Sequence, residues 1–355
     1  MLMLAALQPA HAFEVIENVS LDGLAASALQ CQLVSEPDTD ACRLPAVFRP
    51  GLVWTPTTAG AVHVKLGFAA GNGLNPVSPF VLQPWAADLE DGLKDINGRG
   101  WSHLLTAYYE HRVALGNDTN VRVAGGIIDA TDFLDVNAFA NSEYGQFLNS
   151  AFVNTQLAAP PSYDFGAAAV VTHGRVSVTG VAMSVGTNDS GRPYGYFGGE
   201  IEIETRLPTG EGHVRVLAAT TTTEFAAADG SGRFEALRTL SLSADQMVAP
   251  SVGVFVRAGV QDTAAAVNYG VEATAGVTVL GDLWSRAADT VGMAYGYLGA
   301  GSAAVDHTHA LELYYRAAFG EHVAVTADAQ YMFDHNKDGT EAGGFILGLR
   351  GVLTY

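Results

Sequence analysis

The chain lacks long hydrophobic runs, and it has few charged residues and only two cysteines. Of its 355 residues 15% are charged, and no stretch approaches the roughly 18 uninterrupted apolar residues of a membrane-spanning helix. Positive charge is scarcest, because 18 Lys and Arg stand against 37 Asp and Glu, for a formal net charge of −19. So acidic a chain repels nucleic acid and anionic membrane surfaces. The sequence therefore argues against α-helical membrane proteins and nucleic-acid binders.

The chain is rich in segments that alternate apolar with polar or small residues. Residues 251–260 alternate Val or Ala with Gly, Phe and Arg, and residues 321–331 alternate Val, Ala and Tyr with Ala, Thr, Asp and Gln. A period of two indicates β-strands. The apolar side carries mainly Val, Ala and Leu, whereas the other side carries Gly and polar residues. This arrangement is typical of strands that face lipid on one side and water on the other.

The alternation predicts an all-β fold, a sixteen-stranded antiparallel transmembrane β-barrel that forms a single domain over residues 13–355. Backbone groups in lipid must be hydrogen-bonded within the protein, and a closed barrel achieves this. An even strand number puts both chain ends on one side. The expected strands lie near residues 20–32, 44–56, 61–70, 101–114, 118–128, 161–172, 175–186, 194–207, 211–221, 233–245, 251–261, 266–280, 289–299, 307–319, 321–332 and 343–355.

Two local features bear on these strands. Pro45 and Pro50 lie in the second segment, and because proline cannot donate to a β-ladder they predict a bulge or break there. The last segment ends on the aromatic Tyr355, as the terminal strands of bacterial outer-membrane barrels usually do. Both features fit a barrel.

The N-terminal region predicts an exported protein. Residues 1–12 are expected to be the remnant of a signal peptide, because a short apolar run precedes Ala10-His-Ala12 as a cleavage site. Cys31 and Cys42 are expected to form a disulfide in the first outer loop, since two cysteines that enclose a short loop pair by default in an oxidising compartment. A metal site is disfavoured here, because no histidine lies nearby.

Residues 125–137 read Gly-Gly-Ile-Ile-Asp-Ala-Thr-Asp-Phe-Leu-Asp-Val-Asn, and residues 146–149 follow with Gln-Phe-Leu-Asn. This stretch resembles the carbohydrate-selective porins of the OprB type. Similar segments lie at residues 88–97, 311–316, 326–331 and 348–350. The resemblance implies a channel of the bacterial outer membrane through which small hydrophilic solutes, sugars in the best-known members, diffuse passively.

On this interpretation the protein is no enzyme and needs no cofactor, and the Gly-x-Ser-x-Gly pattern of hydrolases is absent. Its partners are outer-membrane lipid and small sugars or ions as permeants. Outer strand faces rich in Ala and Gly permit a homotrimer without requiring one. The alternative function is a general or mildly cation-selective ion porin without sugar specificity.

Residues opposite the lipid-facing positions are predicted to line the pore. The connection 129–160 is expected to fold into the barrel as a constriction loop, where its carboxylates face wall arginines and set a field across the opening. The row of three glutamates on one strand should be reached by water, because like charges side by side repel one another. The predicted pore residues are Asp129, Asp132, Asp135, Asn137, Arg49, Lys65, Arg112, Arg122, Glu200, Glu202, Glu204, Arg257, Glu312, Tyr314, Arg316 and Arg350.

Two alternatives remain for these residues. Any wall residue can instead form a structural ion pair between neighbouring strands. The loop aspartates have the oxygen ligands of a Ca²⁺ site, although no metal is assigned. Sugar contacts are expected from Tyr108, Tyr314, Arg316 and Glu312, which offer aromatic faces and planar hydrogen-bonding groups.

Overall fold

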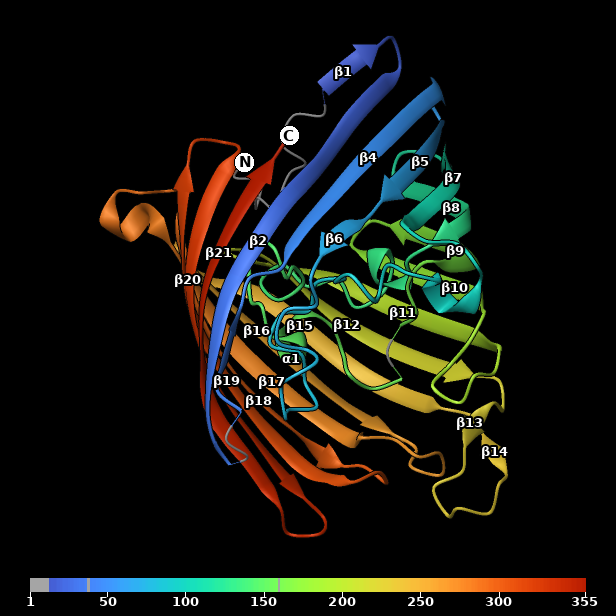
Figure 1. Ribbon diagram of the computed structural model, residues 1–355. Helices are drawn as coiled ribbons and strands as arrows, with labels where there is room; N and C mark the ends of the chain where they lie inside the picture. The colour runs from blue at the N-terminus through green and yellow to red at the C-terminus, as the bar shows by residue number, and fades with distance from the viewer. Residues whose placement is uncertain (1–12, 37–38, 159) are drawn as a thin grey trace.

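The computed structural model describes residues 13–36, 39–158 and 160–355, and these form one closed antiparallel β-barrel of sixteen strands (Figure 1). Each strand pairs with the next along the chain, and the last pairs with the first, which closes the barrel. The strands are β2 (Val19–Glu36), β4 (Ala46–Thr57), β5 (Gly60–Leu66), β7 (Leu104–Ala114), β8 (Thr119–Ile128), β9 (Asp164–His173), β10 (Val176–Val185), β11 (Tyr194–Leu207), β12 (Gly210–Thr221), β15 (Arg238–Ala249), β16 (Val252–Gln261), β17 (Tyr269–Leu280), β18 (Thr290–Ala300), β19 (Val305–Phe319), β20 (Val323–Asn336) and β21 (Glu341–Thr354).

Short strands extend this framework. They are β1 (Phe13–Ile16), β3 (Ala41–Arg43), β6 (Phe68–Ala70), and the pair β13 (Phe225–Ala226) and β14 (Phe234–Glu235). The first three pair with β2 or β4, while β13 and β14 form a separate hairpin in the connection between β12 and β15. That hairpin lies where the sequence predicted the tenth strand to begin, which explains why β15 starts five residues later than expected.

The ladder between β2 and β4 runs through Pro50 without a shift, and the predicted break occurs before β4 and on its other edge. Leu44 and Pro45 separate β3 from β4. Pro50 lies between Gly51, which pairs with β5, and the part of β4 that pairs with β6. Because Pro50 has no N–H to donate, the partner of β4 changes at this point. The disulfide between Cys31 and Cys42 joins β2 to β3 just beside the first of these breaks.

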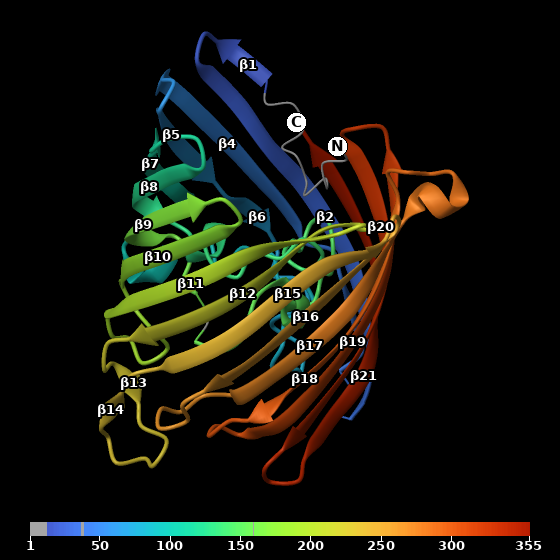
Figure 2. The same ribbon diagram turned by 180° about the vertical axis from the view of Figure 1, so that it is seen from behind.

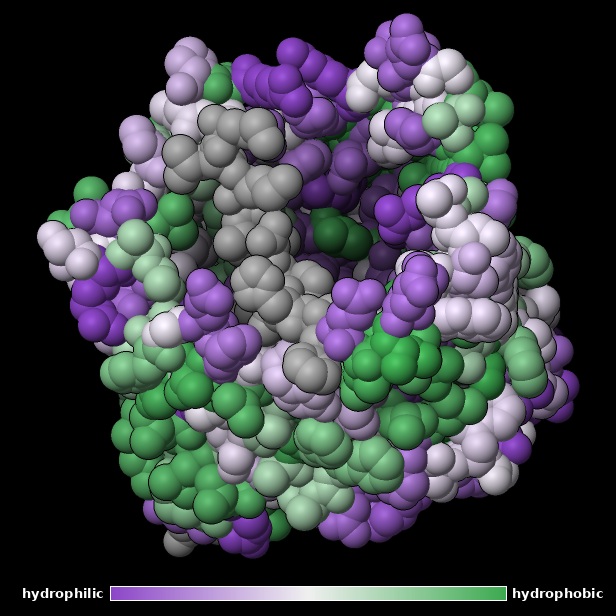
Figure 3. Space-filling view, turned by 90° about the horizontal axis from the view of Figure 1, so that it is seen from above, coloured by the Kyte–Doolittle hydropathy of each residue, from purple (hydrophilic) through white to green (hydrophobic). Residues whose placement is uncertain are grey.

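The two faces of the barrel wall differ as the alternation predicted. Val256, Leu313 and Leu349 point outward with 45–51% of their surface exposed, whereas their neighbours Arg257 and Arg350 are fully buried inside. Figure 3 looks down on the end where β2 begins and β21 ends, and it shows hydrophobic residues on the outer wall and hydrophilic residues around a central hollow. Among the described residues no helix has the length and apolar character to cross a membrane.

Both ends of the barrel sheet lie at one rim, called here the terminus end, and the opposite rim is called the loop end (Figure 1). Connections at the terminus end are tight turns, except residues 281–289, which include the 3₁₀ helix η3 (Gly281–Trp284). Connections at the loop end are longer, except residues 301–304 and 337–340, which are short turns. A strand missed or added in the sequence-based count would have reversed this alternation, so the alternation agrees with the predicted number of sixteen.

Two connections from the loop end, residues 71–103 and 129–163, fold inside the barrel and are called the inserted segments. They contain η1 (Ile96–Gly98), η2 (Ala130–Asp132) and the single-turn helix α1 (Ser150–Val153). The sequence predicted only the second of them as an insertion. In Figure 2, which views the barrel from the opposite side, they lie behind strands β11, β12 and β15.

An apolar core fills part of the barrel interior. Phe80 of the first inserted segment and Phe147 of the second belong to one buried cluster with Phe255 and Tyr314 of the wall. The ring of Phe147 meets that of Tyr314 edge-on at 5.0 Å between centroids. Gly253 leaves room for Phe139, whose Cζ lies 2.1 Å from where a β-carbon would stand. The barrel is therefore packed along β15–β21, and on the other side smaller apolar clusters join the inserted segments to the wall.

Candidate functional site: the cavity inside the barrel

A cavity of about 750 Å³ lies between the inserted segments and strands β2, β4 and β5. Asp22 and Tyr355 line it near the terminus end, where Figure 3 shows the hollow. Deeper lining residues include Val81 and Val153 from the inserted segments. Most of the lining side chains are charged or carry hydroxyl or amide groups. The cavity is thus polar and is bordered by groups that exchange hydrogen bonds with a hydrophilic solute.

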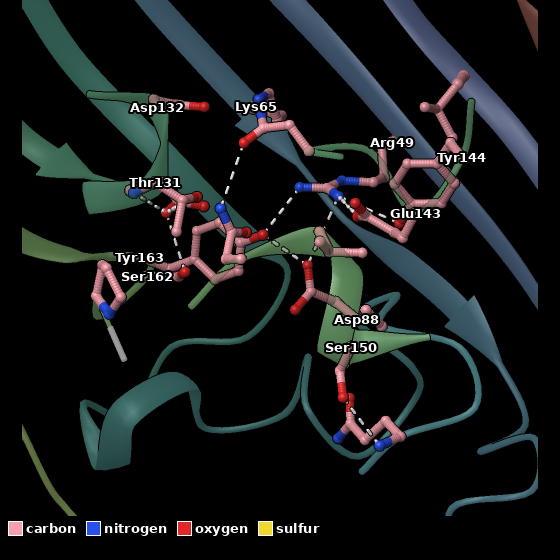
Figure 4. Close-up of a pocket in the computed structure, with 18 of the residues that line it drawn as sticks. Arg49, Lys65, Asp88, Thr131, Asp132, Glu143, Tyr144, Ser150, Ser162 and Tyr163 are labelled. Carbon is pink, nitrogen blue, oxygen red and sulfur yellow. Dashed lines mark hydrogen bonds and ion pairs between the residues drawn. The ribbon is translucent and has the colours of Figure 1, made fainter. Parts of the chain in front are cut away.

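Arg49 of β4 lies at the centre of a hydrogen-bonded cluster (Figure 4). Its guanidinium donates to Glu143 at 3.3 Å, to the hydroxyl of Tyr144 at 3.1 Å and to the hydroxyl of Tyr163 at 2.9 Å. Tyr163 in turn donates to Asp88 at 2.6 Å. These contacts tie both inserted segments to the barrel wall. Since Arg49 forms ion pairs with Asp88 and Glu143, the positive charge of this cluster is neutralised.

The two tyrosines of this cluster stay neutral hydrogen-bond donors. Burial raises the pKa of Tyr144 and of Tyr163 above the usual range, so neither hydroxyl ionises near neutral pH. Tyr163 also has a backbone φ of 62°, which is a rare conformation for a bulky residue. Such strain persists only where surrounding contacts fix it, and the bonds to Arg49 and Asp88 provide them.

A second group of charged residues lies across the cavity (Figure 4). Asp129 directly follows β8 and accepts hydrogen bonds from the hydroxyls of Thr131 at 2.6 Å and Ser162 at 3.0 Å. Burial, together with the nearby charge of Asp132, raises the pKa of Asp129 to about 6. Within the described residues neither Asp132 nor Lys65 has an ion-pair partner within 4.0 Å. Their charges therefore face the cavity unpaired.

Asp22 completes this group from the other side of Lys65. In the register of the sheet Asp22 pairs with Gly51, and Gly51 pairs with Lys65. A β-carbon on Gly51 would stand 2.0 Å from a carboxylate oxygen of Asp22. The missing side chain lets this carboxylate reach over the neighbouring strand toward Lys65.

Several residues predicted to line the pore are instead buried beneath the inserted segments. Arg257 is fully buried and forms an ion pair with Asp135 at 2.9 Å. Arg350 donates to the carbonyls of Glu143 and Gln146. Tyr314 packs in the apolar core, so it is unavailable for the predicted sugar contact. These side chains point into the barrel, as predicted. The inserted segments, however, separate them from the cavity.

Wall carboxylates hold the inserted segments through backbone N–H groups. Glu312 accepts from Leu148 at 2.6 Å and from Asn149 at 2.9 Å. Glu200 accepts from Asp135 at 2.9 Å. The other bonds of this kind join Glu272 to Gln156 and Asp334 to Val81. The expectation that water reaches Glu200 is wrong, because this carboxylate is buried and a peptide N–H replaces water.

The remaining predicted residues form local pairs. Glu202 pairs with Arg215, Glu204 with Arg206, and Glu110 with both Arg112 and Arg122. Asn137 donates to Ser243, and Arg316 donates to the carbonyl of Ala288. Glu202–Arg215 and Glu110–Arg122 are ion pairs between neighbouring strands, as the alternative interpretation expected, whereas Glu204–Arg206 and Glu110–Arg112 each lie within one strand. Of the predicted set, the cavity is lined by Arg49, Lys65, Asp129 and Asp132.

The Ca²⁺ alternative requires the three loop aspartates to converge. Instead Asp135 turns to Arg257 on the wall while Asp129 binds the hydroxyls of Thr131 and Ser162. Within the described residues no three His, Cys, Asp or Glu side chains are grouped so as to hold a metal ion. Asp135 therefore lies apart from Asp129 and Asp132.

Sequence reasoning missed most of the cavity lining. The missed residues with chemistry are Asp22, Asp88, Thr131, Glu143, Tyr144, Ser162 and Tyr163. One signal existed, since Asp88 begins the family-like segment 88–97 at the end of a long connection. The tyrosines lie within or directly after the connection 129–160, but no pattern set them apart from the other aromatic residues.

A sequence profile described as carbohydrate-selective porin, OprB family, matches residues 91–355. The chain belongs to this family. OprB-family proteins are channels rather than enzymes, and their place is the bacterial outer membrane. The prediction made from the central motif and the strand pattern is confirmed.

Solved porins share the fold of this OprB-family chain. The high-pH structure of Pseudomonas putida OprB superposes with a TM-score of 0.75 at 13% identity, covering 96% of this chain and 94% of that one. The outer-membrane channel DcaP of Acinetobacter baumannii gives a TM-score of 0.58 at 12% identity, with 95% and 97% covered. At such identities the likeness concerns the fold alone.

One curated relative matches part of the chain. An uncharacterized protein of Aquifex aeolicus is 40% identical over 108 residues, which is 30% of this chain and 33% of that protein. The matched stretch thus spans about one third of the relative's length.

The homotrimer that the outer strand faces permit stays a prediction.

Proposed function

We propose that the protein is a passive channel for small hydrophilic solutes, carbohydrates above all, and that the cavity beside Arg49 is its constriction. The observation that carries this proposal is the division of the barrel interior. Along β15–β21 the interior is an apolar core, so a solute crosses on the side of β2, β4 and β5, where the cavity lies. Its volume falls in the range of small-molecule sites, about 300–1,000 Å³.

The chemistry of this constriction suits sugar hydroxyls. Arg49 and the two tyrosine hydroxyls donate hydrogen bonds, and Asp88 and Glu143 accept them. A sugar that enters exchanges bonds with water for bonds with groups that are already oriented. Because these groups also bind one another, the exchange is weak and the solute leaves readily, which passage through a channel requires.

A general ion porin without sugar specificity is the second candidate. It is favoured by the unpaired charges of Asp132 and Lys65, which attract small ions as well as sugars. The two candidates differ in whether a neutral sugar interacts with the constriction.

The test is the effect of glucose on the K⁺ current through single channels in planar bilayers, with glucose influx into proteoliposomes measured in parallel. We expect glucose to enter vesicles and to reduce the current in a saturable way. Arg49→Gln removes a charge-assisted hydrogen bond and should weaken the block about tenfold. Arg238→Gln is the matched control, because Arg238 is exposed and pairs with Asp262 outside the cavity. A current without glucose influx would instead support the ion porin.

A further inference from the structure

The charges that line the cavity are out of balance. Two cations, Arg49 and Lys65, stand against the carboxylates of Asp22, Asp88, Asp129, Asp132 and Glu143. Arg49 is already neutralised within its own cluster by two of these carboxylates. Outside that cluster, therefore, three carboxylates of the cavity lining stand against the single ammonium group of Lys65.

The position of these carboxylates keeps them available to a solute. Asp22 reaches over Gly51 on one side of Lys65. Asp132 also lines the cavity and lies to the other side of Lys65 in Figure 4. Asp132 is exposed, and within the described residues its carboxylate has no ion-pair partner. An ammonium group presents three donors and suits free carboxylate oxygens.

Hydroxyl-binding groups lie opposite these carboxylates. In Figure 4 Arg49, Tyr144 and Glu143 lie at one side, Asp132 lies at the other, and Lys65 lies between them. A solute that bridges the two sides carries hydroxyl groups at one end and a positive charge at the other. This combination describes an amino sugar.

We propose that the cavity passes cationic sugars faster than neutral or acidic sugars of the same size, and that Asp22 and Asp132 set this preference. The inference rests on the proposed function, since it assumes that sugars cross here. An ammonium group gains attraction from the unpaired carboxylates, whereas a sugar carboxylate is repelled by them. The attraction between one ammonium group and one carboxylate in water-filled space should raise the occupancy of the cavity by the cationic sugar roughly fivefold.

The experiment compares influx of radiolabelled glucose, glucosamine and glucuronate into proteoliposomes at low and high salt. We expect glucosamine to enter roughly three to five times faster than glucose, and glucuronate to enter more slowly. At about 1 M salt the Debye length falls to about 3 Å, so the three rates should converge.

Variants locate the effect. The double variant Asp22→Asn/Asp132→Asn should bring the glucosamine-to-glucose ratio close to one, whereas Lys65→Gln should raise the ratio. Asp118→Asn is the matched control, because Asp118 is exposed in the turn between β7 and β8 at the same end of the barrel. Asp132→Glu keeps the charge and should keep the ratio. The heat-dependent gel shift of folded barrels checks that each variant has assembled.

Each outcome decides something. Equal influx of the three sugars at low salt overturns this inference and leaves the proposed function standing. No influx of glucose overturns the proposed function itself. A preference that Asp118→Asn abolishes as well would assign it to the general field of the acidic rim and would overturn the role of Asp22 and Asp132.

Discussion

Asp129 lies where strand β8 ends and the second inserted segment begins. Burial raises the pKa of its carboxyl group to about 6, and the neighbouring charge of Asp132 acts in the same direction. The hydroxyl and backbone N–H of Thr131 and the charge of Lys65 act against this rise. The charge on Asp129 thus changes within the range from mildly acidic to neutral pH.

The sign of the effect on stability follows from this shift. The folded-state pKa lies above the ordinary aspartate value of about 3.9, so the folded protein opposes ionisation. The stability that neutral Asp129 contributes is present below the unfolded pKa and is lost as pH rises through the folded pKa. Ionised Asp129 therefore costs the fold stability, which is consistent with a role in the pore and not in packing.

We expect the K⁺ over Cl⁻ preference of the channel to rise between pH 5 and pH 8, with a midpoint near the pKa of Asp129, because its ionisation adds a negative charge to the cavity. The reversal potential under a KCl gradient measures this. Asp129→Asn should flatten the curve. The groups that face Asp129 are Asp132, Glu143, Lys65 and Tyr163, and a step that persists in the variant would assign the titration to one of them.

Strand β3 is a short element that a covalent bond attaches to the barrel. Its Cys42 pairs with Cys31 of β2 both in register and through the disulfide. Beyond Pro45 the chain resumes as β4, which has its own ladder with β2. The disulfide therefore restrains the first outer connection, and the closed sheet does not depend on it.

Replacing Cys31 and Cys42 together by Ser should loosen this connection and leave the channel intact. In the chain-entropy model a disulfide across so short a loop contributes about 3 kcal/mol, and only against the unfolded state. We expect faster limited proteolysis between residues 31 and 42, with unchanged conductance and an unchanged heat-dependent gel shift. Loss of the gel shift would show that barrel closure needs the bond.

At the scale of the whole molecule the acidic character of the chain has two separate roles. Some carboxylates line the cavity, but Glu200, Glu272, Glu312 and Asp334 hold the inserted segments by accepting backbone hydrogen bonds. A net charge of −19 therefore overstates how negative the pore is, since part of it is buried under peptide N–H groups.

Glu312→Leu tests this second role. The change leaves the N–H groups of Leu148 and Asn149 buried without an acceptor, so the free energy of unfolding should fall by about 2–6 kcal/mol. The inserted segment should loosen and the single-channel conductance should rise and fluctuate. Glu312→Gln keeps one acceptor oxygen and should show a smaller effect, and the exposed Glu211→Gln should show none. An unchanged conductance in Glu312→Leu would mean that the other wall carboxylates suffice.

The strands could be predicted from the sequence because their signal is local. Alternation such as that of residues 251–260 encodes at once the strand, its inward face and its place in a barrel. The path of the long connections could not be predicted in the same way. Whether residues 71–103 enter the barrel depends on contacts such as that of Asp334 with the N–H of Val81, 253 positions away. A carboxylate that binds a distant peptide group has no signature in the sequence.

The same reason explains the errors at the site. The row Glu200, Glu202 and Glu204 was expected in water because strand neighbours alone were considered. The inserted segment changes the environment of Glu200 without changing the strand. Likewise Tyr144 and Tyr163 become part of the cavity only through Arg49 on a strand about 100 residues earlier.

The position of the apolar core relative to the order of the chain has a consequence for assembly. The inserted segments end at residue 163, whereas most of the wall that covers them lies in β15–β21, after residue 237. Ile346 of β21 is fully buried in that core, and the same strand pairs with β2. In the folded protein, β21 therefore closes the hydrogen-bonded ring and also covers apolar faces of the inserted segments. A change that displaces β21 should thus open the ring and expose part of the barrel's apolar filling at the same time.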